Sequence, residues 1–105
     1  MELDAYVVDT LMPDLVGHDH QPSAFLVYLF LWRRTRAEGV DEAPASLRQI
    51  AEGTGLSRRA VQDAVGRLAH RQLIGVERAS ITAVPRYRVH RPWARWMEDA
   101  EPPAG

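Results

Sequence analysis

Residues 46–74 read SLRQIAEGTGLSRRAVQDAVGRLAHRQLI, and they predict two short amphipathic helices joined by a glycine turn. Ser46 can cap the first helix, because Gln49 stands three residues later, where the reciprocal partner of a capping box belongs. Gly53 and Gly55 bracket Thr54. We therefore expect the first helix to end there and the chain to turn.

The second helix is predicted to begin at Ser57, whose hydroxyl can accept a hydrogen bond from an amide of the first turn. Apolar residues at helical spacing give it a buried stripe of Val61, Ala64, Val65 and Leu68. Its opposite face carries Arg58, Arg59, Gln62, Asp63 and Arg67. Two helices joined by a turn of three or four residues, with arginines facing outward on the second, are typical of a DNA-binding helix-turn-helix.

Residues 50–62 (IAEGTGLSRRAVQ), followed by RQLIGV at residues 71–76, resemble the winged helix-turn-helix regulators of bacterial transcription, of the GntR-like and MarR-like kinds. They also resemble the winged domains of plasmid replication initiators. The resemblance covers about half of the chain. It implies a three-helix core followed by a β-hairpin wing, with DNA as the partner.

The composition indicates one folded domain. A chain of 105 residues with 46% hydrophobic residues can bury a modest core. The absence of cysteine from the sequence excludes disulfides, thiolate metal sites and a cysteine nucleophile. The first residues are acidic and show no basic region of a secretory signal, so we expect a cytoplasmic protein.

The net charge of −1 conceals an asymmetry along the chain. Residues 1–45 hold three arginines and eight acidic residues, a net charge of −5. Residues 46–96 hold ten arginines and three acidic residues, a net charge of +7, and residues 97–105 are acidic. The basic block coincides with the two predicted helices and the segment after them, as a surface that faces phosphates requires. The alternative is that arginine is simply the common surface cation of this chain.

The N-terminal extension, residues 1–21, is predicted to hold one helix over residues 2–12, with an apolar face of Leu3, Tyr6, Val7, Thr10 and Leu11. Pro13 is expected to end this helix, and residues 14–21 to form a polar connection. A strand beginning at Tyr6 is the alternative.

The winged helix-turn-helix domain is predicted over residues 22–92. Its first helix should run from residue 22 to residue 38 and end at Gly39, with an acidic loop over residues 40–45. The apolar run over residues 24–32 is too short to span a membrane, which takes about 20 residues.

This first helix carries more apolar surface than a three-helix core needs, namely Phe25, Tyr28, Leu29 and Trp32. The surplus should meet either the N-terminal helix or a second subunit. Because helix-turn-helix proteins usually read paired half-sites, we expect a homodimer that forms through the N-terminal helices. The alternative is a monomer in which the N-terminal helix covers the surplus.

The wing is predicted over residues 75–90, with strands at residues 73–76 and 86–90 and a tip at residues 79–84. Val76 can pair with Tyr87 or Val89 toward the core, and Arg86 and Arg88 then share the solvent face. Residues 93–105 should form a short helix carrying Trp93 and Trp96, followed by an acidic, disordered tail.

The recognition helix, residues 57–70, should place its first residues nearest the bases of the major groove. Arg58 and Arg59 are candidates for guanine, with phosphate contact as the alternative for each, while Gln62 could read adenine and Asp63 cytosine. The expected backbone contacts come from Arg48 and Arg67, from the wing arginines Arg78, Arg86 and Arg88, which could instead simply be solvated, and from the cap residue Ser57.

Other chemistry is not predicted. His18 and His20 could be half of a metal site, but there is no cysteine, and helical spacing to Asp14 is not expected in a connection. We find no nucleophile elbow and no phosphate-binding glycine loop, so neither an enzyme nor a cofactor is expected. Nothing in the sequence demands a small-molecule effector.

The sequence therefore predicts a mainly α-helical protein with a small β-hairpin, a winged helix-turn-helix with an additional N-terminal helix. The predicted function is sequence-specific binding of double-stranded DNA by a small transcriptional regulator. Two alternatives stay open. One is a DNA-binding protein of plasmid or phage replication or partition, and the other is a winged-helix module for protein–protein interaction.

Overall fold

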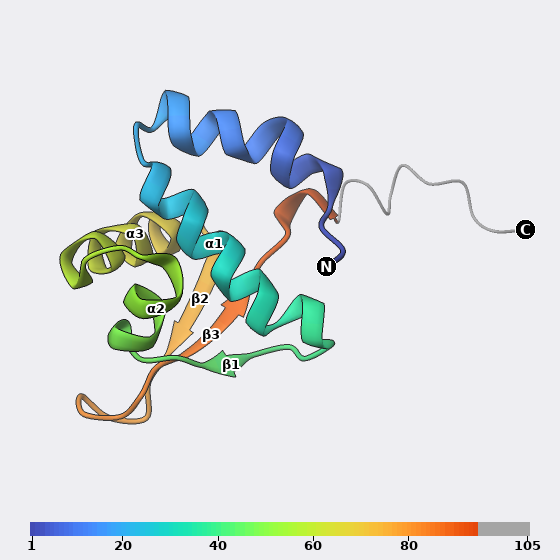
Figure 1. Ribbon diagram of the computed structural model, residues 1–105. Helices are drawn as coiled ribbons and strands as arrows, with labels where there is room; N and C mark the ends of the chain where they lie inside the picture. The colour runs from blue at the N-terminus through green and yellow to red at the C-terminus, as the bar shows by residue number, and fades with distance from the viewer. Residues whose placement is uncertain (95–105) are drawn as a thin grey trace, which may run out of the picture.

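The computed structural model describes residues 1–94, and Figure 1 shows their arrangement. The elements are the π-helical turns η1 (Val7–Leu11) and η2 (Asp14–His18), helix α1 (Pro22–Arg34), the 3-10 turn η3 (Arg36–Glu38), strand β1 (Ala43–Pro44), helices α2 (Leu47–Thr54) and α3 (Arg58–His70), and strands β2 (Ile74–Glu77) and β3 (Arg86–Val89). Residues 95–105 lie outside the described part, and the predictions for Trp96 and the acidic tail lie there with them.

The helix-turn-helix forms as its capping residues predict. Ser46 Oγ accepts the amide of Gln49 at 3.0 Å, and the Gln49 side chain accepts the amide of Ser46 at 2.9 Å. Helix α2 ends at Gly55, which has a φ of 79°, a conformation that favours glycine. Ser57 Oγ then accepts the amide of Ala60 at 3.1 Å and starts α3. Caps of this kind stabilise a helix by about 1 kcal/mol each.

Helix α1 is the centre of the core, and it packs against α2, α3 and β3. The buried stripe of α3 consists of Val61, Ala64 and Leu68, and α2 contributes Ile50. Helix α2 approaches α1 closely at Gly53, where a Cβ atom would overlap the Phe30 ring. A side chain at this crossing would therefore force the Phe30 ring to move.

The wing is part of a three-stranded antiparallel sheet of order β1-β3-β2. Ile74 pairs with Val89 and Val76 with Tyr87, which is one of the two predicted registers. The prediction that Val76 faces the core is wrong, because its side chain is 42% exposed while Ile74 is buried. The expected acidic loop over residues 40–45 instead contains β1, in which Ala43 pairs with Tyr87. Pro44 is tolerated because β1 is an edge strand, whose outer edge has no neighbouring strand that needs an amide donor. The fold is that of a winged helix-turn-helix.

The N-terminal segment stays helical through Pro13, so the prediction that this proline ends the helix is wrong. The amide of Met12 donates to the carbonyl of Val7, and the amide of Asp19 donates to that of Asp14. Both bonds reach five residues back, and such π-type turns widen the helix. The wider turn accommodates a residue that lacks an amide hydrogen and would collide with the preceding turn of an α-helix.

Helix α1 ends at Arg34, four residues earlier than predicted. Thr35 leaves helical geometry with φ −117° and ψ −81°, and its hydroxyl donates to the carbonyl of Leu31 at 2.7 Å. A 3-10 turn follows, and Gly39 ends it at φ 72°, where a terminator was expected. No helix within residues 1–94 combines the length and the apolar character that crossing a membrane takes.

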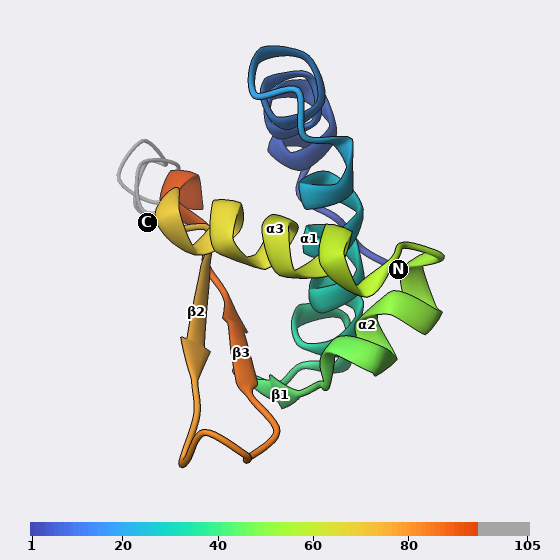
Figure 2. The same ribbon diagram turned by 90° about the vertical axis from the view of Figure 1, so that its left-hand side faces the viewer.

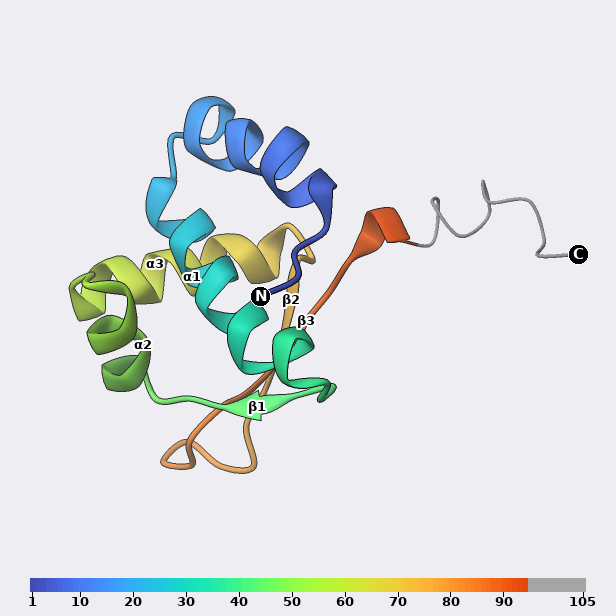
Figure 3. The same cartoon turned by 45° about the vertical axis from the view of Figure 1, so that its right-hand side comes forward.

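Most of the surplus apolar surface of α1 is covered within the chain, although Leu29 is only partly buried and Leu26 is 43% exposed. Figures 1 and 3 show the N-terminal helical segment lying along one side of α1. The Trp32 indole donates to the carbonyl of Glu2 at 2.8 Å, and the Tyr6 ring stacks on Trp93 with 4.6 Å between centroids. Phe25, Tyr28 and Trp32 are buried. The N-terminal segment, one of the two partners expected for this surface, therefore covers these three side chains, and the homodimer stays a prediction.

Candidate nucleic-acid interface

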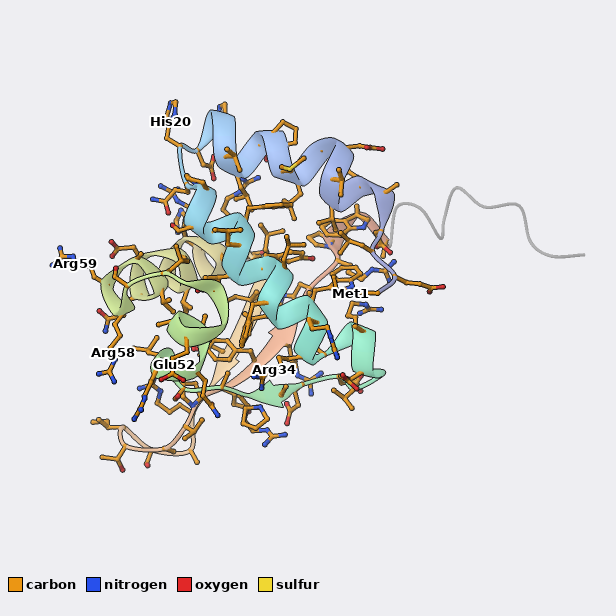
Figure 4. All side chains as sticks on the ribbon, in the orientation of Figure 1. Met1, His20, Arg34, Glu52, Arg58 and Arg59 are labelled. Atoms are coloured by element: carbon orange, nitrogen blue, oxygen red, sulfur yellow. The ribbon has the colours of Figure 1, made fainter. Side chains whose placement is uncertain are left out.

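The exposed face of α3 and the wing lie on the same side of the molecule. Figure 2 shows α3 across the front, with α2 beside its first turn and the β2–β3 hairpin projecting below. Figure 4 shows Arg58 and Arg59 pointing away from the body of the protein at the start of α3. The short turn over residues 55–57 fixes this orientation, because both of the helices it joins are capped.

Four predicted base-reading residues occupy the exposed face of the first turns of α3, namely Arg58, Arg59, Gln62 and Asp63. Within residues 1–94, none of the four side chains makes a hydrogen bond or an ion pair. Their donors and acceptors are therefore available to a partner molecule. The Ser57 hydroxyl is engaged in capping, as predicted.

A groove runs between the start of α2, the first turns of α3 and the base of the wing. Its lining brings together Arg48, Arg58, Gln62 and Arg78, which are four of the ten predicted site residues. The remainder of the groove comes from wing residues 82–85 and from the cap of α2. Three arginines from three separate elements thus converge around the side chain of Gln62.

Two of these arginines have weak internal partners. Arg48 pairs with Glu52 one helical turn later at 2.9 Å, and both side chains are well exposed. Such an exposed pair contributes at most about 1 kcal/mol, so Arg48 can exchange Glu52 for a phosphate. Arg78 donates to the carbonyl of Ile81 at 3.4 Å, a contact within the wing tip.

The other two wing arginines share an acidic partner that the sequence did not predict. Arg86 Nε lies 2.7 Å from one carboxylate oxygen of Glu42, and an Arg88 nitrogen lies 3.5 Å from the other. Glu42 precedes β1, and its position beside β3 results from the pairing of these strands. The sequence shows acidic residues at positions 41 and 42, but the loop predicted there had no expected strand pairing that would place them beside the wing.

Two arginines lie near the end of α3, and they have different surroundings. Arg67 lines a second hollow together with Gln62, Asp63 and His70, further along α3 than the groove. Arg71, which directly follows α3, donates to Asp14 at 2.6 Å and to Asp19 at 2.9 Å. The hydrogen bond to Asp14 and then that to Asp19 raise the pKa of Arg71 above its ordinary value. Arg71 therefore holds α3 against the N-terminal segment.

Two buried tyrosines position the wing. The Tyr28 hydroxyl of α1 donates to the carbonyl of His90 at 2.9 Å, directly after β3. Tyr87 is fully buried at the centre of the sheet. Burial raises the pKa of both hydroxyls, so both stay protonated at neutral pH.

Comparisons of the sequence with models of protein families and with curated proteins found no match. Among solved structures, the chain is similar to NMB1585, a MarR family regulator from Neisseria meningitidis, at a TM-score of 0.51 and 15% sequence identity. That alignment covers 90% of this chain and 65% of the regulator, so this chain spans less than two thirds of the regulator's length. It is also similar to a variant of ZitR from Lactococcus lactis in its apo form, at a TM-score of 0.47 and 20% identity, over 94% of this chain and 70% of the other. The first of these likenesses supports the fold, a winged helix-turn-helix like that of a MarR family regulator.

Proposed function

We propose that this protein binds double-stranded DNA sequence-specifically and acts as a small transcriptional regulator rather than as an enzyme. The observation that carries the proposal is the row of four polar side chains on the first turns of α3, without partners among residues 1–94. They lie beside a groove that gathers three arginines. The likeness in fold to a MarR family regulator supports the same function. A DNA target also implies a cytoplasmic location, which is part of the proposal.

In this proposal α3 enters the major groove, with Arg58 or Arg59 paired to guanine and Gln62 to adenine. Asp63 can accept a hydrogen bond from cytosine. The Ser57 hydroxyl, which accepts a hydrogen bond in capping α3, can still donate its hydrogen to a phosphate. The backbone contacts come from Arg48 at the edge of the groove and from Arg67 further along α3. The wing contacts the backbone or the minor groove through Arg78, Arg86 and Arg88.

The proposal includes a homodimer formed through the N-terminal helices. Val8, Met12 and Val16, which are 43%, 37% and 39% exposed, succeed one another at four-residue intervals along the N-terminal helical segment. They lie on a different face of that segment from Val7, Leu11 and Leu15, which are buried against α1 and its neighbours. A second copy of the chain would cover this strip and place two α3 helices on paired half-sites.

Selection of bound sequences from a random duplex pool tests the DNA proposal directly. We expect purified protein to enrich one motif, and its affinity for that motif to fall steeply as salt rises, because phosphate contacts release counterions. A protein that enriches no motif, or whose binding to duplex does not respond to salt, is not the proposed regulator. An acidic protein partner would then become the better candidate for the arginine face.

A further inference from the structure

A second cluster of polar side chains lies at the corner between the N-terminal segment and α1, away from the groove. It consists of Asp14, His18 and Asp19. A metal site was not expected here, because residues 14–21 were predicted to be a non-helical connection. The structure makes residues 14–18 a helical turn, so Asp14 and His18 share one face.

The two carboxylates of this cluster divide their oxygen atoms between two neighbours. His18 Nδ1 lies 3.1 Å from Asp19 Oδ1 and 3.8 Å from Asp14 Oδ1. The Oδ2 atoms instead bind Arg71, at 2.6 Å from Asp14 and 2.9 Å from Asp19. One oxygen of each carboxylate and one imidazole nitrogen therefore converge, while Arg71 fixes the orientation of both carboxylates from behind.

We propose that Asp14, His18 and Asp19 form a binding site for a divalent transition metal ion of the zinc type. Their three ligand atoms lie within 4.8 Å of one another. Ligand atoms at about 2.1 Å from a zinc ion are about 3.0–3.4 Å apart, so small side-chain movements close the site. Arg71 then acts on the carboxylates as outer hydrogen-bonding partners do in known metal sites, holding each in its ligating orientation.

The ligand set selects the metal. One imidazole nitrogen with two carboxylate oxygens suits zinc and its neighbours, whereas magnesium and calcium prefer oxygen ligands alone. The two carboxylates carry one negative charge more than the Arg71 guanidinium that binds them, and Arg67 adds only a more distant positive charge near Asp19. His18 is 83% exposed, so solvent can complete the coordination.

Calorimetric titration of the untagged, full-length chain with zinc chloride tests the site, after treatment with a chelator. We expect one zinc ion per chain, and a loss of affinity of about tenfold or more in His18→Ala. This variant keeps both bonds from Arg71 and loses only the exposed hydrogen bond between His18 and Asp19, so its thermal unfolding should stay close to that of the parent chain. Asp19→Asn should also weaken binding, and its folding is checked by the same melt.

His20→Ala is the matched control. Figure 4 shows His20 pointing outward at the same corner, two residues from His18 and outside the cluster. Its substitution should leave zinc affinity unchanged, and zinc should shift the NMR signals of the His18 ring but not those of the His70 ring. No binding at millimolar zinc would overturn the proposal, as would equal binding by His18→Ala and the parent chain. Magnesium binding as tightly as zinc would overturn the role of the imidazole.

Discussion

The hydroxyl of Tyr28 in α1 donates a hydrogen bond of 2.9 Å to the main-chain carbonyl of His90, which directly follows β3. Tyr28 is fully buried, and 62 residues separate the two partners along the chain. This bond joins the central helix to the strand that carries half of the wing. The position of the wing relative to α3 therefore depends on a residue of α1, outside both elements.

Tyr28→Phe should destabilise the protein by about 1–3 kcal/mol, because it leaves the His90 carbonyl without its donor in a partly buried position. Urea unfolding followed by circular dichroism measures the loss. Tyr6→Phe is the control, since Tyr6 contributes a stacked ring and no hydroxyl hydrogen bond among residues 1–94. A Tyr28→Phe protein as stable as the parent would show that the bond contributes nothing.

The same tyrosines predict a loss of stability in alkali. Burial raises the pKa of Tyr28 and Tyr87 above the ordinary value of 10.0. Below pH 10 the hydroxyls are protonated in both states, and above it they ionise first in the unfolded chain. Stability should therefore fall as pH rises through about 10 toward the folded pKa values. Melting temperatures between about pH 9 and pH 11 should fall less steeply in Tyr28→Phe than in the parent.

Gly53→Ala should destabilise the protein by about 1–3 kcal/mol, because the new Cβ overlaps the Phe30 ring where α2 crosses α1. Gly66→Ala is a matched control, since it lies within α3 and no atom lies within 4 Å of its added Cβ. The control should stabilise the chain by up to about 1 kcal/mol through helix propensity. Adding Phe30→Leu should rescue Gly53→Ala in part, and equal effects of the two glycine substitutions would contradict this account.

The parts of this fold that the sequence predicted are those governed by local chemistry. The Ser46–Gln49 capping box, the Ser57 cap and the turn at Gly55 each depend on residues within a few positions. The pairing of Val76 with Tyr87 agrees with the alternation in the two wing strands. Such signals are read directly, because the hydrogen-bond partners are close in sequence.

The failures arise where distant contacts override a local rule. Pro13 is tolerated within a helix because Leu11 and Leu15 on either side of it are buried in the core, and that burial holds the chain helical. Strand β1 forms because β3 supplies its partner, although residues 43–44 alone have no strand signal. The proximity of Asp14 and His18 was missed because the helical turn that brings them together follows Pro13, where the sequence predicted the helix to end.

The ion pairs of Arg71 predict a loss of stability in acid. The hydrogen bond from His18, and then the interactions with Arg71, lower the pKa of Asp19 below its ordinary value of 3.8. Asp19 therefore stabilises the fold above that value, and the contribution is lost as pH falls through the folded pKa. Asp19→Asn should be less stable than the parent near neutral pH and should lose less stability on acidification. Melting curves at about pH 3 and pH 6 measure both effects.

The strip of Val8, Met12 and Val16 predicts the oligomeric state. Analytical ultracentrifugation of the parent chain at micromolar concentration should give twice the chain mass of 11.8 kDa. Met12→Glu should give a monomer without loss of folding, because the side chain is exposed within one chain and its charge would be buried only in the dimer. Thr10→Glu, an exposed change outside the strip, should leave the dimer intact. A parent chain that sediments at 11.8 kDa would end the dimer proposal.

Single substitutions in the first turns of α3 should alter DNA recognition. Arg58→Ala and Gln62→Ala should each relax specificity at one base pair of the selected motif, at a cost of about 1–3 kcal/mol on the correct sequence. Arg48→Ala should instead weaken all sequences alike and reduce the dependence of binding on salt, as expected of a phosphate contact.

Arg33→Ala is the control for lost charge, because this exposed arginine of α1 pairs with Glu38 and not with the groove. It should bind DNA nearly as well as the parent. Binding of each variant to the motif and to its single-base variants, measured by fluorescence anisotropy at fixed salt, separates the two kinds of contact. If Arg58→Ala and Gln62→Ala weaken every sequence equally, neither residue reads a base, and α3 contacts only the backbone.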